Sequence, residues 1–140
     1  VELAPIADRL KTPLLIEAVN RYESPVGHGL ADTWDIARRA GSPFVWILPD
    51  TFHMNIEESN MRQAISAHQA CFGSFHLSDN NRHFPGFGAL DFGAIIGMLD
   101  EVGYQGKLAI EGNVRTSFIA DVEGAMRGLG PHLTRKPGER

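Results

Sequence analysis

Short apolar runs alternate with longer amphipathic stretches along this chain. Four runs have the length and composition of buried strands, at 14–16, 44–48, 74–77 and 107–110. Five stretches place apolar residues at helical spacing, at 2–11, 32–40, 60–71, 92–102 and 117–129. Strands and helices therefore alternate, and no hairpin signal joins consecutive strands. This order predicts successive βα units with parallel strands and right-handed crossovers.

Length and composition narrow the class of protein. The chain has 140 residues, 43% of them hydrophobic, and a net charge of -4, which predicts one soluble globular unit. No apolar run approaches the roughly 20 residues of a membrane span. Mild acidity without a basic stripe argues against nucleic acid as the main partner. A single cysteine, Cys71, excludes an intramolecular disulfide and fits a reducing compartment, so we expect a cytoplasmic protein.

Ionisable residues gather directly after the second apolar run. Asp50, His53, Glu57 and Glu58 fall within the nine residues that follow Pro49. We interpret Glu57 and Glu58 as residues in the first turn of a solvated helix, where the helix dipole favours acidic side chains. We interpret Asp50 and His53 as candidate site residues, because polar residues also end the other three strands.

The strand-end residues share one expected location. Glu17, Asp50, His76 and Glu111 are separated by 33, 26 and 35 residues, each about one βα repeat. In a parallel sheet all four lie at the carboxyl edge. Three carboxylates and one imidazole form an N/O ligand set suited to Mn²⁺, Mg²⁺, Co²⁺ or Zn²⁺.

Four motifs in order carry a resemblance to a known family: LLIEAVNRYE, LPDTFHMNIEE, FHLSDNNRHFPGFGALDF and LAIEGN. They resemble the last four βα units of the sugar isomerase/epimerase family with xylose-isomerase-like barrels, in particular its ketose 3-epimerases. The resemblance implies an α/β fold, the C-terminal half of a (β/α)₈ TIM barrel. It would occupy residues 1–130, with a frayed tail at 131–140.

The resemblance also implies a site and a reaction. The implied metal ligands are Glu17, Asp50, His76 and Glu111, and the implied substrate-binding residues are Glu23, His53 and Arg82. One divalent ion, Mn²⁺ or Co²⁺ before Mg²⁺ or Zn²⁺, would assist epimerisation of a ketose sugar at C3 through a cis-enediolate. Glu17 and Glu111, while ligating the metal, would act as acid and base. Gly112 would let the substrate approach the backbone.

Three other functions stay open. An aldose–ketose isomerase of the same superfamily, acting on hydroxypyruvate or an inosose, would use the same metal and glutamates. Endonuclease IV proteins share this barrel and cut DNA at abasic sites, but they need further His and Asp ligands and a basic groove, and the sequence indicates neither. A truncated half barrel that binds metal without catalysing anything is the third.

The length of the chain departs from a whole barrel. A (β/α)₈ barrel needs roughly 250 residues, whereas this chain begins at Val1, without an initiator Met, and supplies four units. Either the start was processed or the chain is a piece of something longer. Because four units are missing, we interpret it as a piece of a longer product rather than as a chain whose core is completed only by a second copy. Because a half barrel leaves strand edges and an apolar face uncovered, we expect self-association, at least to a dimer.

Overall fold

The computed structural model describes residues 2–133 and confirms the alternation of strands and helices. The strands are β1 (Leu14–Glu17), β2 (Val45–Leu48), β3 (Phe75–Leu77) and β4 (Leu108–Ile110). The helices are α1 (Ala4–Leu10), α2 (Leu30–Arg38), α3 (Thr51–Glu57), α4 (Met61–His68), α5 (Phe92–Glu101) and α6 (Phe118–Leu133), and a 3₁₀ turn, η1 (Gln69–Cys71), extends α4. None of these helices is long and apolar enough to cross a membrane.

All strand pairing in the described residues is parallel, as the sequence predicts. β1 pairs with β2 and β3 pairs with β4. The two pairs meet through single bridges, Ile47 to Phe72 and Asp50 to His76. The backbone N–H of His76 donates to the carbonyl of Pro49 at 2.8 Å. The four strands therefore form one row, and their carboxyl ends lie on the same side of it.

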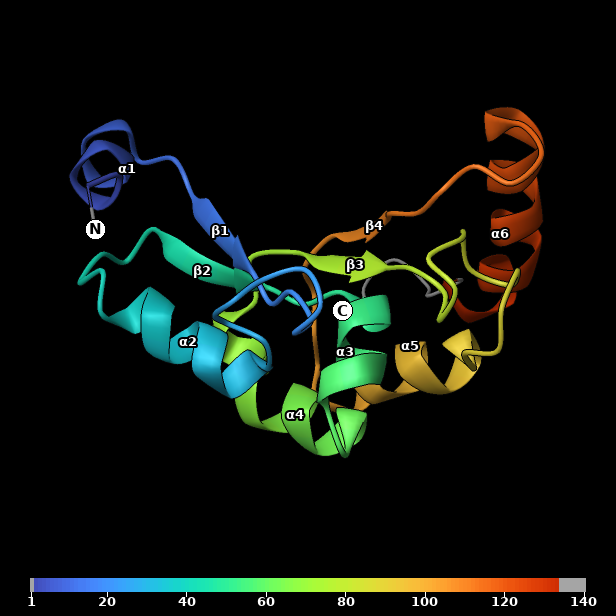
Figure 1. The fold of residues 1–140 in the computed structure, drawn as a ribbon, viewed down its shortest axis with the longest axis horizontal. Coiled ribbons are helices and arrows are strands. Elements are labelled where there is room, and N and C mark those ends of the chain that lie inside the picture. The colour runs from blue at the N-terminus through green and yellow to red at the C-terminus, as the bar shows by residue number, and fades with distance from the viewer. Residues whose placement is uncertain (1, 134–140) are drawn as a thin grey trace.

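The core lies between the strands and the helices that follow them. In Figure 1, α2, α4 and α5 lie on one side of the strands, while α1 and α6 stand at the two ends. Ile47, Ile65 and Phe75 are completely buried in this layer. Side chains alternate between the two faces of a strand, so every second strand residue points away from the helices. Leu15 is one of these and remains 39% exposed.

The prediction that all four apolar runs form buried strands is wrong for the two outer strands. β2 and β3 are largely buried, but residues of β1 and β4 are only half-buried or exposed. The physical reason is position, because the described residues place no further strand beside β1 or β4. The apolar sequences of β1 and β4 are typical of strands that neighbouring strands of a complete barrel would cover.

Two helix boundaries differ from the sequence prediction. The segment after Asp50 forms α3 rather than a loop, and Glu57 and Glu58 lie at its C-terminal end instead of in a first turn. Seven residues are too few to show a helical period clearly. The last helix, α6, continues to Leu133, so the predicted boundary at residue 130 falls inside it. The rest of the predicted tail, 134–140, lies outside the described residues.

Candidate active site

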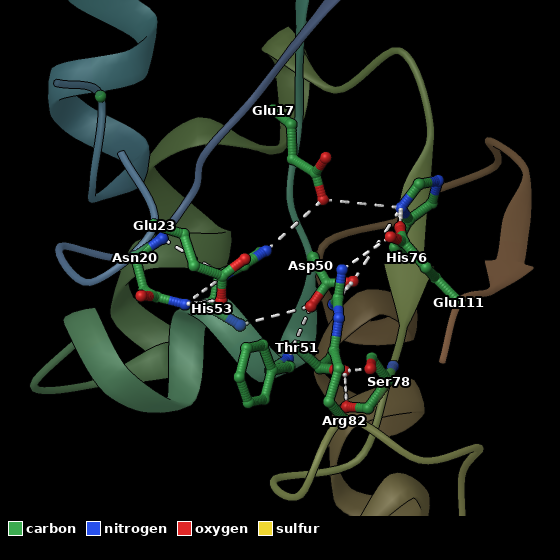
Figure 2. A network of polar contacts seen from close by, with 12 residues as sticks. Glu17, Asn20, Glu23, Asp50, Thr51, His53, His76, Ser78, Arg82 and Glu111 are labelled. Carbon is green, nitrogen blue, oxygen red and sulfur yellow. Dashed lines mark hydrogen bonds and ion pairs between the residues drawn. The ribbon is translucent and has the colours of Figure 1, made fainter. Parts of the chain in front are cut away.

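Four strand ends bring their polar side chains to one point (Figure 2). Glu17, Asp50, His76 and Glu111 each place one ligand atom within 4.8 Å of the others. The alternation of side chains along a strand explains this. Glu17 lies two residues after Leu15 and therefore points, like Leu15, away from the helices. Asp50, His76 and Glu111 lie at matching positions in the neighbouring strands and point to the same side. The set predicted from chain spacing is thus assembled in space.

A buried pair of hydrogen bonds joins the two halves of the row beneath this cluster. The hydroxyl of Thr51 donates to the carbonyl of Ser78 at 2.6 Å and accepts from the N–H of the same residue at 2.8 Å. This closed pair fixes the end of β2 against the end of β3. Asp50 and His76, which precede these two residues, are thereby held at one depth.

Several polar atoms of the cluster are buried without a hydrogen-bond partner. Glu17 Oε1, Asp50 Oδ2 and His76 Nδ1 belong to this group, as does Arg82 Nη1. Burying such atoms unsatisfied is costly. Ion pairs compensate in part, since His76 Nδ1 pairs with a carboxylate oxygen of Glu111. Carboxylate and imidazole atoms that meet at one point are a donor set that could hold a divalent cation.

Arg82 supplies a second positive group to the cluster. Its guanidinium lies 2.8 Å from Asp50 Oδ2 and 2.6 Å from Glu111 Oε1. Its Cζ lies 5.0 Å from the centre of the Phe52 ring, within cation–π range. Arg82 also has φ of 62°, a left-handed conformation that few residues with a side chain adopt. This unusual backbone turns the side chain back across the strand ends.

The charges of the cluster shift its proton affinities. Burial works against ionisation of Glu17, but His76, His53 and Arg82 outweigh it and lower the pKa of Glu17. Burial raises the pKa of Asp50, with Arg82 and His53 opposing it. Contact with Glu17 raises the pKa of His76, and the charges of Glu111 and Asp50 add to this effect. The three carboxylates therefore favour the protonated form of His76. A metal ion that binds His76 would have to displace this proton.

The residues proposed for substrate binding border the cluster differently. His53 is 2% exposed, and its Nε2 lies 3.9 Å from Glu17 Oε1. Asp50 caps α3 by accepting from the N–H groups of Phe52 and His53, at 2.8 Å and 3.3 Å, and this orients the start of the helix. Glu23 is exposed and reaches the cluster only through Asn20 (Figure 2). The sequence offered no signal for Asn20, because its partners are set by tertiary packing.

The architecture and the cluster agree with comparisons to known proteins. A profile of the xylose isomerase-like TIM barrel family matches residues 1–133. The chain belongs to this family. It therefore contains four βα units of a (β/α)₈ barrel, and the predicted half barrel is confirmed.

The curated relatives that the chain matches include sugar epimerases. The chain is 37% identical over 113 residues to a 3-dehydro-D-guloside 4-epimerase of Escherichia coli, covering 81% of this chain and 43% of the relative. It is 38% identical over 110 residues to a D-psicose 3-epimerase of Enterocloster bolteae, covering 79% and 36%. A solved L-ribulose 3-epimerase superposes with a TM-score of 0.86 at 29% identity, covering 94% of this chain and 50% of that one. The chain thus spans half the length of these relatives or less.

A buried carboxylate orders the loop that carries Arg82 in this family member. Asp79 is fully buried, and its two oxygens accept from four backbone N–H groups at 2.8–3.1 Å. The donors are Asn80, Gly86, Gly88 and Leu90. The carbonyl of Asp79 also accepts from the N–H of Arg82 at 2.9 Å. Asp79 lies within the third motif, but the sequence does not single it out, because its role depends on contacts up to eleven residues away.

The space beside Gly112 is used by the protein itself. A Cβ at this position would lie 2.8 Å from the backbone carbon of His83, so only glycine fits. The expectation that Gly112 opens the backbone to substrate is therefore wrong. Its role is to let the Arg82 loop pack against the end of β4, where the N–H of Asn113 donates to the carbonyl of Arg82 at 2.6 Å.

The end of α3 holds the loop after β1. Glu57 accepts from the backbone N–H of Arg21 at 2.7 Å and from its guanidinium at 2.9 Å and 2.8 Å. Glu58 accepts from the N–H of Leu30 at 2.8 Å, at the start of α2. These two glutamates fix both ends of the segment that carries Glu23, so their role is structural support.

Proposed function

We propose that this chain carries the proton-transferring half of a metal-dependent sugar epimerase that inverts C3 of a ketose. The observation that supports this most directly is the convergence of Glu17, Asp50, His76 and Glu111 within 4.8 Å. Two of the four are glutamates from the first and last strands of the row. A reaction that removes a proton from one face of a carbon and returns one to the other needs two such groups.

The donor set fits one divalent cation, with Mn²⁺ or Co²⁺ as our first expectation. Glu17, Asp50, His76 and Glu111 would hold it, and the first three support this assignment because each buries an atom that lacks a hydrogen-bond partner and has only ion pairs around it. When bound, such an ion would supply Lewis-acid polarisation of the sugar oxygens on the carbonyl carbon and on its neighbour.

The chain's own residues would perform the proton transfers. The lowered pKa of Glu17 keeps its carboxylate ionised, which is the form that can accept the C3 proton. The electron pair of the broken C3–H bond moves onto the C2 carbonyl oxygen. When the pair returns to C3, Glu111 in its protonated form delivers a proton to the opposite face, so that Glu17 ends protonated and Glu111 ionised. Arg82 and His53, which border the cluster, would donate to the oxygen that gains negative charge.

Metal binding to the 140-residue chain tests the site. Calorimetric titration with Mn²⁺ and Co²⁺ should give one ion per chain. Glu17→Gln and Asp50→Asn should each remove most of the binding, while Glu123→Gln, an exposed change on α6, should leave it intact. Equal binding by all variants, or none by folded wild type, would contradict the assignment.

Solvent exchange identifies the reaction. In D₂O, a C3 epimerase incorporates deuterium at C3 of a ketose such as D-psicose and forms its epimer. A putative hydroxypyruvate isomerase of Streptomyces coelicolor, 30% identical over 115 residues, favours aldose–ketose isomerisation as the second candidate. That reaction moves the carbonyl and labels C1 or C2 instead. A chain that binds metal but exchanges no deuterium would support the inactive half barrel and assign catalysis to a longer product.

We also propose that copies of this chain associate. Within the described residues, the outer strands β1 and β4 each have a paired strand on one side only, and apolar residues such as Leu15 on β1 and Ile119 on α6 are exposed, at 39% and 71%. Such edges favour association. Light scattering should report at least the mass of a dimer, and a monomeric mass would refute this. The cytoplasmic location stays a prediction.

A further inference from the structure

Asn20 is buried between two residues of the candidate site, Glu23 and His53 (Figure 2). The orientation of its side-chain amide follows from a backbone contact. The N–H of Tyr22, which can only donate, lies 2.9 Å from Asn20 Oδ1. The other amide atom is therefore Nδ2, which can only donate. It lies 2.8 Å from Glu23 Oε1 and 2.7 Å from His53 Nδ1.

A second donor from the same residue faces the same ring nitrogen. The backbone N–H of Asn20 points at His53 Nδ1 over 3.2 Å. Because neither group can accept a hydrogen bond, Nδ1 must be the acceptor and carries no proton. A neutral imidazole with a bare Nδ1 has its proton on Nε2. Nε2 is the nitrogen that faces Glu17, at 3.9 Å.

We propose that Asn20 is a positioning residue that holds His53 as its Nε2–H tautomer and fixes the Glu23 carboxylate beside it. The buried amide of Asn20 thereby fixes two groups at the edge of the carboxylate cluster. The Nε2–H of His53 is a hydrogen-bond donor, and the carboxylate of Glu23 is an acceptor. Such a pair suits neighbouring oxygens of a polyhydroxylated substrate, one an acceptor and one a hydroxyl. This last step rests on the proposed function, whereas the tautomer does not.

The chemistry of the position explains why an amide is needed. Aspartate has almost the same shape, but it has no N–H to donate and would face the Glu23 carboxylate with like charge. In Asn20→Asp the backbone N–H of residue 20 still faces Nδ1 over 3.2 Å, but the shorter contact of 2.7 Å now brings a carboxylate oxygen, which can only accept, so we expect Nδ1 to become the donor. The ring itself stays in place for two reasons. The backbone N–H of His53 donates to Asp50, and the rings of His53 and Phe52 pack edge to face with their centroids 5.1 Å apart.

Long-range ¹H–¹⁵N spectra of the ¹⁵N-labelled, metal-free chain test the tautomer directly. His53 resonances are identified by their loss in His53→Gln. We expect an unprotonated-type shift for Nδ1 and a protonated-type shift for Nε2. Through-bond ¹⁵N–¹⁵N coupling across the hydrogen bond should connect Nδ1 to an Asn20 nitrogen. A proton on Nδ1 of wild type would overturn the proposal, as would coupling that is absent from a folded sample.

Variants separate positioning from stability. Asn20→Asp should move the proton onto Nδ1. The matched control is Asn60→Asp, because Asn60 caps α4 by accepting from Gln63 at 3.0 Å and aspartate caps equally well. Its His53 spectrum should equal that of wild type. An unchanged tautomer in Asn20→Asp would overturn the role of the side chain. No metal or sugar is present, so these results stand apart from the titrations that test the proposed function.

Discussion

Replacing Asp79 by asparagine should disorder the loop that carries Arg82. The change is nearly isosteric, but one of the two carboxylate oxygens becomes an NH₂ group. Two of the four backbone N–H groups that Asp79 accepts from then lose their acceptor and face a donor. Because Asp79 is fully buried, water cannot replace the lost acceptor while the loop keeps its shape.

The magnitude follows from those two bonds. Hydrogen bonds to a charged acceptor contribute roughly 1.5–3 kcal/mol each, so their loss would cost about 3–6 kcal/mol in a rigid loop. The loop can instead open locally and hydrate its N–H groups, which limits the loss in global stability. We therefore expect a loss of about 3 kcal/mol in the free energy of unfolding, together with faster amide exchange over residues 79–90.

Two measurements and one control decide this prediction. Urea denaturation, followed by the fluorescence of Trp34 and Trp46, reports global stability, and hydrogen exchange by mass spectrometry reports the loop. Asp91→Asn is the matched control, because Asp91 caps α5 by accepting from Ala94 at 2.9 Å and asparagine caps as well. It should shift stability by less than about 0.5 kcal/mol. If Asp79→Asn leaves both the midpoint and the loop exchange at wild-type values, the role assigned to Asp79 is refuted.

Three further predictions concern pH and the core. Because the pKa of His76 is raised above 6.5, its contribution to the stability of the metal-free chain is complete below that pH and is lost as pH rises through the folded value. Metal affinity should do the reverse, rising about tenfold per pH unit below that pKa; calorimetry across pH checks this, and parallel trends would contradict it. The Arg21 hydrogen bonds lower the pKa of Glu57 to about 2, so their stabilising effect is present above pH 4.5 and fades as pH falls toward 2. Since Arg21 is exposed, solvent screening keeps this effect small, and Glu57→Gln should flatten the acid limb of a denaturation profile. Phe75→Ala, at a residue with no exposure, should cost about 3–5 kcal/mol, whereas Leu3→Ala, 61% exposed, should cost under about 0.5 kcal/mol in urea unfolding.

Patterns short enough to lie within one element were sufficient to predict the strands. An apolar run that ends at an acidic or imidazole side chain indicates both the strand and the position of its carboxyl end. Once four such runs alternate with helices, parallel pairing brings Glu17, Asp50, His76 and Glu111 to one edge. The prediction of that cluster needed no knowledge of side-chain contacts, only the regular geometry of parallel strands.

Features that depend on distant partners could not be predicted in this way. Asn20 and Asp79 look like ordinary polar residues of loops, yet each is buried and satisfies several groups at once. Asn20 contacts a histidine 33 residues away, and nothing in the local sequence marks that distance. The short helix α3 was missed for a related reason, since about two turns do not establish a period.

The sequence by itself therefore determined the order of the elements, the parallel sheet and the four residues that share its carboxyl edge. These follow from residue periodicity and from the fixed alternation of strand side chains, both of which are local. Tertiary structure alone decided the orientation of Arg82 across the site, the use of the space beside Gly112 and the donors that face His53. Each of these depends on which backbone and side-chain groups meet after the strands have paired, and that is a property of packing across the whole chain.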